Sequence, residues 1–150
     1  MTPELIDRIV KEARSWIGTP YHHKSMIKGV GVDCGGLLYQ VYKPIIPAIG
    51  TFPSSYAEDW SMHKDDNEIY LDFIMPYVIE VPFPIVGGVS VWKYGRNYAH
   101  GSIVVADGRW VHAYGRTSHG QVLETKENFF HARHAGKRPV KHYKVDERWL

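Results

Sequence analysis

The single cysteine of the chain stands where a nucleophile could be activated. Cys34 follows Asp33 and precedes two glycines, and the apolar residues after them predict a helix that begins here. Asp33 can cap that helix, and the unpaired amide groups and positive dipole end would favour a thiolate. A cysteine in such a place can have a pKa between about 3.5 and 7.5. This local pattern predicts nucleophilic chemistry, and the alternative is an inert buried cysteine.

Gly35 and Gly36 place a small surface in the first turn of this helix. Each glycine costs roughly 1 kcal/mol relative to alanine within a helix. Either a substrate approaches the sulfur at this point, or another part of the chain packs closely against the helix. The sequence leaves both explanations open.

Two histidines on neighbouring predicted strands could act as a base and its orienting partner. His100 and His112 lie in runs of strand-forming residues that Asp107 and Gly108 separate. A two-residue turn would place the two rings on opposite faces, since side chains alternate along a strand. A three-residue loop from Ala106 to a left-handed Gly108 would place them on one face, roughly 7–8 Å apart. We adopt the second geometry because it forms a pair; the alternative is two ordinary half-buried strand histidines.

The elements that must position these side chains follow an α+β order. Thr2, Pro3 and apolar residues at helical spacing predict a first helix that Gly18 ends, and Pro44 ends the helix that begins at Asp33. The proline-rich middle is interpreted as irregular cover over one face, with short helices expected at 54–62 and 65–75. Strand-like runs follow at 89–94, 99–106, 109–114, 120–124 and 138–145.

Length and composition exclude several classes of protein. The chain has 150 residues, of which 44% are hydrophobic and 23% charged, so we expect one globular domain over 1–150. One cysteine excludes an intrachain disulfide framework. A net charge of +2 gives no reason to expect nucleic acid, and no apolar run is long enough to span a membrane. The charged, amphipathic N-terminal residues do not resemble a signal peptide, so synthesis in the cytoplasm is expected.

Metal chemistry is not expected from this sequence. His131 and His134 have a spacing that would fit one helical face, which makes a metal site conceivable there. We expect no metal and no cofactor.

Five blocks of sequence, read together, carry a resemblance to a known family. They are 13–21 (ARSWIGTPY), 32–37 (VDCGGL), 87–92 (GGVSVW), 99–105 (AHGSIVV) and 110–113 (WVHA). In this order they resemble the NlpC family of papain-like cell-wall cysteine peptidases, above all the short form associated with phage tails and gene transfer agents. The chain departs from the family's usual pattern at Gly35, where serine is commoner, and at Gly88, where aspartate is usual.

The resemblance implies an α+β, papain-like domain with N-terminal helices packed on a central antiparallel sheet. It implies a peptidase that cleaves peptidoglycan stem peptides, commonly next to D-γ-glutamate, with Cys34 as nucleophile, His100 as base and His112 as the third, orienting residue. Tyr21 matches a family tyrosine whose hydroxyl lies near the cysteine. The backbone N–H of Cys34, aided by Tyr21, is then the expected oxyanion hole, and Asp33 and Trp92 are further candidates for binding the substrate.

The expected partners are a peptidoglycan peptide and phage-type tail proteins, with no nucleic acid and no membrane. We expect a protein made without a signal peptide and packaged in a phage or phage-like tail. Two alternatives stay open. One is a related amidase or acyltransferase on the same scaffold, which a long apolar groove near Cys34 would favour. The other is a non-enzymatic component of a tail.

Overall fold

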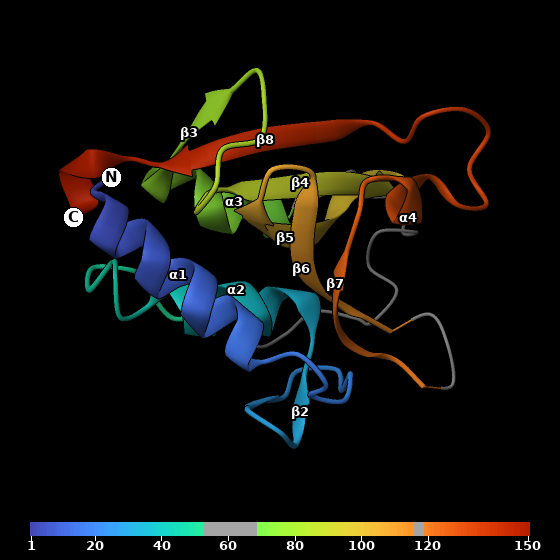
Figure 1. Cartoon of the computed structure of the whole chain (residues 1–150), viewed down its shortest axis with the longest axis horizontal. Coiled ribbons are helices and arrows are strands. Elements are labelled where there is room, and N and C mark those ends of the chain that lie inside the picture. The colour runs from blue at the N-terminus through green and yellow to red at the C-terminus, as the bar shows by residue number, and fades with distance from the viewer. Residues whose placement is uncertain (53–68, 116–118) are drawn as a thin grey trace.

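The computed structural model describes residues 1–52, 69–115 and 119–150, and in them helices precede most of the strands (Figure 1). This arrangement confirms the predicted α+β class. The elements are α1 (Pro3–Ser15), β1 (Met26–Ile27), β2 (Gly31–Val32), α2 (Cys34–Tyr42), α3 (Ile69–Ile74), the 3₁₀ helix η2 (Met75–Tyr77), β3 (Val78–Val81), β4 (Val89–Tyr94), β5 (Asn97–Ala106), β6 (Arg109–Tyr114), β7 (Gln121–Thr125), α4 (Asn128–His131), β8 (Val140–Val145) and the 3₁₀ helix η3 (Glu147–Trp149).

Helix α1 begins as the sequence predicts. The hydroxyl of Thr2 accepts a hydrogen bond from the N–H of Leu5, and Pro3 occupies the first helical position, where no N–H is needed. Gly18 follows the end of the helix with a left-handed φ of 90°. Ile9 is fully buried on the side of α1 that packs against the sheet.

The main sheet has the strand order β3-β8-β4-β5-β6-β7, and every neighbouring pair is antiparallel. Because side chains alternate, the sheet separates two hydrophobic clusters. The helix face, covered by α1 and α2 (Figure 1), carries Val91 and Ile103. The tryptophan face carries Trp92 and Trp110, which pack against Phe130 of α4. Whether His100 and His112 lie on the helix face or on the tryptophan face therefore decides which hydrophobic cluster surrounds them.

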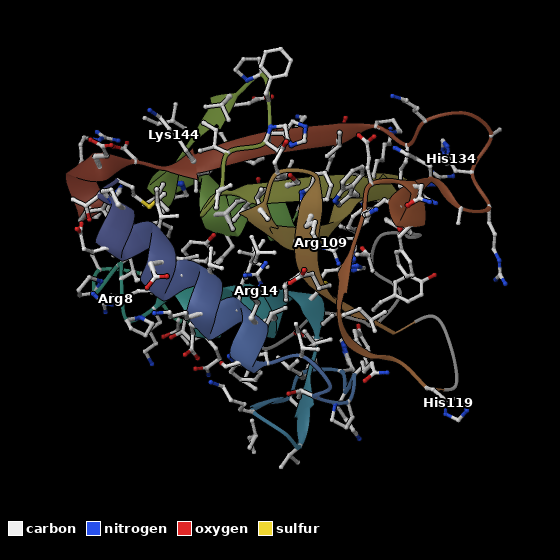
Figure 2. The ribbon with its side chains drawn as sticks, in the orientation of Figure 1. Arg8, Arg14, Arg109, His119, His134 and Lys144 are labelled. Carbon is white, nitrogen blue, oxygen red and sulfur yellow. The ribbon has the colours of Figure 1, made fainter. Side chains whose placement is uncertain are left out.

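Glu124 of β7 ties the sheet to α1. Its Oε1 accepts a hydrogen bond from Arg14 Nε at 2.8 Å, and its Oε2 accepts one from Arg109 Nε at 2.7 Å. Figure 2 shows Arg14 on α1 and Arg109 on the sheet directed into the space between them. A carboxylate shared by two guanidinium groups fixes the position of α1 relative to strands β6 and β7.

The hairpin of β5 and β6 differs in detail from the predicted loop. Ala106 pairs with Arg109, so the turn has two residues, and the extra residue is Val105, which forms a bulge inside β5. The bulge shifts the pairing by one residue, as the three-residue loop would have done. His100 and His112 consequently lie on the same face of the sheet, the tryptophan face.

The proline-rich middle contains more regular structure than the sequence indicates. β3 pairs with β8 along its whole length, from Val78 opposite Val145 to Val81 opposite His142. The loop before Cys34 likewise contains the short hairpin of β1 and β2. The segment 65–75 is helical from the start of α3, and the helix expected at 54–62 lies outside the described residues.

Candidate active site

Asp33 fixes the start of α2, as predicted. Its Oδ1 accepts a hydrogen bond from the N–H of Gly36 at 2.8 Å, which caps the helix. Its Oδ2 accepts one from the N–H of Lys24 at 2.9 Å. Lys24 has a φ of 63°, so the carboxylate also holds an unusual backbone conformation in the preceding loop. Asp33 thereby connects that loop rigidly to the first residue of α2, Cys34.

The first turn of α2 lies where two strands of the sheet separate. The described pairing of β5 with β6 ends at Ile103 and Val111, beyond which β5 pairs with β4 and β6 pairs with β7. Cys34 Sγ lies 3.6 Å from the carbonyl oxygen of Ala99 and also meets the backbone of Gly101. The thiol therefore lies against the main chain on both sides of His100.

His100 and His112 form a direct contact across this separation. His100 Nε2 and His112 Nδ1 are 2.8 Å apart, and the two rings are nearly perpendicular, with centroids 5.0 Å apart. Both rings lie on the tryptophan face, whereas the body of α2 packs on the helix face. The separation of β5 and β6 is thus what allows the first residue of α2 to reach the strand that carries His100.

His112 is enclosed by aromatic rings and one hydroxyl group. The residue is fully buried, with the rings of Phe130 and Phe129 centred 4.6 and 5.1 Å away. Its second ring nitrogen, Nε2, is 2.9 Å from Thr125 Oγ1. Burial, and secondarily the neighbouring His100, hold the pKa of His112 well below its ordinary value. His112 is therefore a neutral ring at pH 7.

Sequence reasoning did not find Thr125, Phe129 or Phe130 as parts of this site. Thr125 lies opposite Trp110 in the β6–β7 pairing, and this register puts it on the same face as His112. The signal was present in the alternation of the two strands. It could be read only with the register of β7 known, because a shift by one residue would turn Thr125 to the other face.

The expectation of a lowered pKa for Cys34 is wrong, because its surroundings raise the pKa. Burial, followed by the negative charge of Asp33, raises the pKa of the Cys34 thiol to about 12. The backbone amide groups of Gly101, Gly35 and Cys34 itself act in the opposite direction but do not outweigh these two effects. A helix N-terminus favours a thiolate, but here the cap that forms the helix start is itself an anion. The resting residue is a thiol, so attack by sulfur requires a base.

Close packing explains the two glycines that follow Cys34. A Cβ on Gly35 would collide with the ring of Phe52, and a Cβ on Gly36 would lie 2.9 Å from the carbonyl oxygen of Ser25. At both positions, the space that a Cβ would need is therefore filled by neighbouring parts of the chain. Of the two explanations that the sequence left open, the structure supports packing.

The three residues expected at oxyanion or substrate-binding positions have different surroundings. Tyr21 packs its ring on the backbone of Gly115 and donates its own N–H to Gly120 O at 2.8 Å, next to the sheet edge. Asp33 is buried and both its carboxylate oxygens bind backbone N–H groups, so it positions Cys34. The expectation for Trp92 is wrong. Its ring is fully buried and stacks on Phe130, with centroids 4.0 Å apart.

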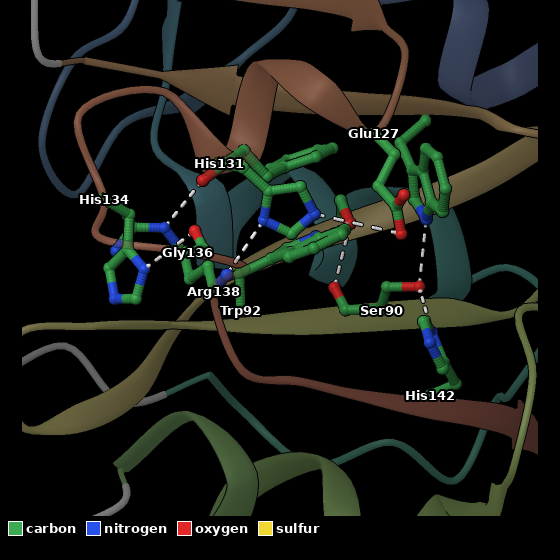
Figure 3. A network of polar contacts seen from close by, with 11 residues as sticks. Ser90, Trp92, Glu127, His131, His134, Gly136, Arg138 and His142 are labelled. Atoms are coloured by element: carbon green, nitrogen blue, oxygen red, sulfur yellow. Dashed lines mark hydrogen bonds and ion pairs between the residues drawn. The ribbon is translucent and has the colours of Figure 1, made fainter.

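A network of polar contacts clamps α4 over the tryptophan face (Figure 3). Arg138 donates from Nε to the carbonyl of Phe130 at 2.7 Å and from a terminal nitrogen to that of Lys93 at 2.9 Å. The N–H of Arg138 also donates to His131 Nδ1 at 2.9 Å, as Figure 3 shows. The clamp holds Phe130 in place against the ring of His112.

The arrangement of these elements can be compared with known proteins. Neither a family model nor a curated protein sequence matches the chain. Among solved structures, the NlpC/p60 domain of the peptidoglycan hydrolase SagA is similar over 91% of this chain and 96% of that chain, with a TM-score of 0.56 and 22% sequence identity. The fold is that of an NlpC/p60 domain. This likeness confirms the papain-like α+β architecture that the sequence motifs imply.

Within this NlpC/p60 fold, the two histidines considered for a metal site, His131 and His134, have local partners. His131 Nδ1 accepts the N–H of Arg138, and His134 lies outside α4, with Nδ1 3.3 Å from Gly136 O. Across residues 1–52, 69–115 and 119–150, no group of three or more His, Cys, Asp or Glu side chains could hold a metal ion. None of the helices in these ranges has the length and apolar character of a bilayer-crossing segment.

Proposed function

We propose that the chain is a cysteine peptidase that hydrolyses amide bonds in peptidoglycan stem peptides. The observation that carries this proposal is that Cys34 Sγ lies against β5 beside His100, whose ring contacts His112 of β6. The likeness of the fold to a domain of a peptidoglycan hydrolase supports the substrate class, as does the resemblance of the sequence motifs to the NlpC family.

In the first step, His100 would take the thiol proton through its Nδ1 atom. Its Nε2 atom is engaged with His112, and Nδ1 is the ring nitrogen closer to the main chain, against which Cys34 Sγ lies. As the proton moves to Nδ1, the sulfur electron pair attacks the amide carbon. The carbonyl electrons move to oxygen and form an oxyanion. The raised pKa of Cys34 makes this proton transfer part of the attack, because the resting state is not an ion pair.

The amide groups at the start of α2 would stabilise the oxyanion. The N–H groups of Cys34 and Gly35 face the sulfur, and a helix N-terminus favours negative charge. Tyr21 remains our candidate for a further donor. Charged His100 then protonates the leaving amine, the C–N bond breaks, and a thioester to Cys34 forms. Water, deprotonated by His100, attacks the thioester carbon and releases the acid product and the thiol.

His112 would position His100 throughout these steps. A neutral third residue adds no charge beside charged His100, whose charge the oxyanion already balances. The burial of His112 keeps it neutral, so it can accept a hydrogen bond from His100 Nε2. This contact holds the ring plane of His100 while its Nδ1 atom exchanges protons with sulfur, amine and water.

Digestion of purified peptidoglycan, with mass spectrometry of the fragments, tests the proposal. The wild-type chain should release fragments cut within the stem peptide, and Cys34→Ala should release none. Cys34→Ser retains the shape of the side chain and should also be inactive, since a hydroxyl is a much weaker nucleophile. Fragments released equally by Cys34→Ala would refute the assignment. Wild-type protein that is folded and releases nothing from several peptidoglycan types would favour the non-enzymatic alternative.

One observation bears on the alternative of acyl transfer. An apolar pocket lies behind Gly35, between α2, α3 and the start of β3, and is lined by side chains that include Leu38, Phe52 and Phe73. Its volume is about 30 Å³, enough for one or two water molecules but not for a long acyl chain. Hydrolysis therefore remains the favoured reaction. Adding a primary amine to the digestion distinguishes the two, because an acyltransferase would attach the amine to the new carboxyl end.

We further propose that this peptidase forms one domain over residues 1–150 and is packaged in a phage-type tail. The support is the resemblance of its motifs to the short, tail-associated form of the NlpC family. Tail proteins would then bring the enzyme to the cell wall. Mass spectrometry of purified tail particles from the source cells should detect the chain in fixed proportion to tail proteins, and particles without it would refute the packaging.

A further inference from the structure

His112 makes a polar contact through each of its two ring nitrogens. Nδ1 lies 2.8 Å from His100 Nε2, and Nε2 lies 2.9 Å from Thr125 Oγ1. The ring is fully buried, so bulk water cannot substitute for either contact. Around the ring, Phe129 and Phe130 contribute apolar surface, with centroids 5.1 and 4.6 Å away. In this apolar enclosure, a hydrogen-bonding group next to Nε2 strongly affects which protonation state of the ring is stable.

The sheet register places Thr125 where it can make this contact. Leu123 lies opposite His112 and Thr125 lies opposite Trp110, so Thr125 is the diagonal neighbour of His112 on the tryptophan face. Thr125 is the last residue of β7, and it is still paired with Trp110 of β6. The end of the β6–β7 ladder therefore places its hydroxyl.

The direction of the hydrogen bonds depends on the charge of His100. While His100 is neutral, the Thr125 hydroxyl can either donate to His112 Nε2 or accept from it. When His100 is charged, both its nitrogens carry protons, and Nε2–H must donate to His112 Nδ1. The proton of neutral His112 must then be on Nε2, and this N–H needs an acceptor. Thr125 Oγ1 is in position to be that acceptor.

We infer that Thr125 is a positioning residue of this site: its hydroxyl accepts the Nε2–H of His112 while His100 is charged. The inference rests on the proposed function, because charged His100 is an intermediate of the proposed hydrolysis. Without the hydroxyl, the buried Nε2–H has no partner in that state, and the steps that pass through charged His100 slow down. Substrate binding does not involve this contact and stays unchanged.

Thr125→Val tests the inference, because valine keeps the shape and strand preference of threonine and removes the hydroxyl. We expect kcat on a soluble stem peptide to fall about tenfold, with KM within about twofold of wild type. Thr125→Ser restores the hydroxyl and should recover most of this loss. Ser102→Ala is the control: it also removes a buried hydroxyl from the tryptophan face, where Ser102 contacts Trp92, and kcat should not change. A Thr125→Val enzyme with wild-type kcat, or a Thr125→Ser enzyme equally impaired, would overturn the inference.

Nitrogen NMR of the His100 and His112 rings gives a readout that needs no turnover. In a Cys34→Ala background, once both ring nitrogens of His100 carry protons, His112 should carry its proton on Nε2. Adding Thr125→Val leaves this buried N–H without a partner, so His100 should take up its second proton only at a lower pH. An unchanged pH for this protonation would overturn the inference even if kcat fell. If that pH shifts but wild-type protein cleaves no stem peptide, the proposed function fails while the contact between Thr125 and His112 is upheld.

Discussion

Replacing Asp33 with asparagine should affect stability and thiol acidity in opposite senses. Asp33 accepts backbone hydrogen bonds from Gly36 and from Lys24, and its charge is the second cause, after burial, of the raised pKa of Cys34. Asparagine is a good helix cap, so the contact with Gly36 survives. Its NH₂ group cannot accept, so the contact with Lys24 is lost together with the charge.

The expected loss of stability follows from the Lys24 contact. Removing the acceptor of this partly buried backbone hydrogen bond costs about 0.5–1.5 kcal/mol. For a chain of this length, that corresponds to a fall in Tm of roughly 2–5 °C. Lys24 also has a φ of 63°, which its neighbours must hold in place, so we expect a value in the upper part of this range.

The thiol should become more acidic in the same variant. With the carboxylate removed, the pKa of Cys34 falls from about 12. At a pH below this pKa, each unit of decrease raises the thiolate fraction about tenfold. A more acidic thiolate is a weaker nucleophile, so the rate of alkylation should rise only about threefold to fourfold per unit. Cys34 is partly exposed, so a small alkylating reagent can reach it.

Alkylation by iodoacetamide at pH 7 to 9, followed by intact mass, measures the rate, and urea unfolding measures the stability. Asp146→Asn is the matched control. Asp146 caps η3 by accepting the N–H of Arg148 at 3.1 Å, and it is not among the groups that shift the pKa of Cys34. Its removal should leave alkylation unchanged. If Asp33→Asn left the alkylation rate unchanged or lowered it, the electrostatic account of the Cys34 thiol would be wrong.

Three further predictions test the buried histidine and the packing. Burial lowers the pKa of His112, so below about pH 6.5 the unfolded chain binds a proton that the folded chain does not, and the free energy of unfolding should fall by up to about 1.4 kcal/mol per pH unit. Urea unfolding at pH 5.5 and 7.5 should show a smaller fall for His112→Asn than for wild type, and equal falls would contradict this. Phe130→Ala should cost about 3–5 kcal/mol, since this ring is buried against Trp92; a loss under about 1 kcal/mol by the same assay would be inconsistent with the packing. Gly35→Ala should lower the free energy of unfolding by about 1–3 kcal/mol, because the new Cβ collides with Phe52. In thermal unfolding, the double variant with Phe52→Ala should lose less stability than the sum of the two single variants, and a loss equal to that sum would argue against the collision.

Features that depend on neighbouring residues in the chain could be read from the sequence. Thr2 and Pro3 predict the start of α1, and Asp33 predicts the start of α2, because a cap satisfies N–H groups only a few residues away. The bounds of β4 and β6 could likewise be predicted from runs of β-branched and aromatic residues.

Features that depend on distant pairing could not. β3 is a strand because β8, more than sixty residues later, supplies its hydrogen-bond partners. Trp92 is close to His100 in sequence and on the same face, yet Phe130 covers it, so its side chain is not available to a substrate. The raised pKa of Cys34 also depends on burial, which the local helix start does not reveal.

The amino-acid sequence by itself determined which side chains could do chemistry and which elements carry them: a thiol at a helix start, and two imidazoles on neighbouring strands. The tertiary structure decided that β5 and β6 separate where α2 begins, that the bulge at Val105 turns both imidazoles to one face, and that Thr125 meets the second of them. The physical reason is that caps and alternation act over a few residues, whereas register and burial are set by the whole sheet.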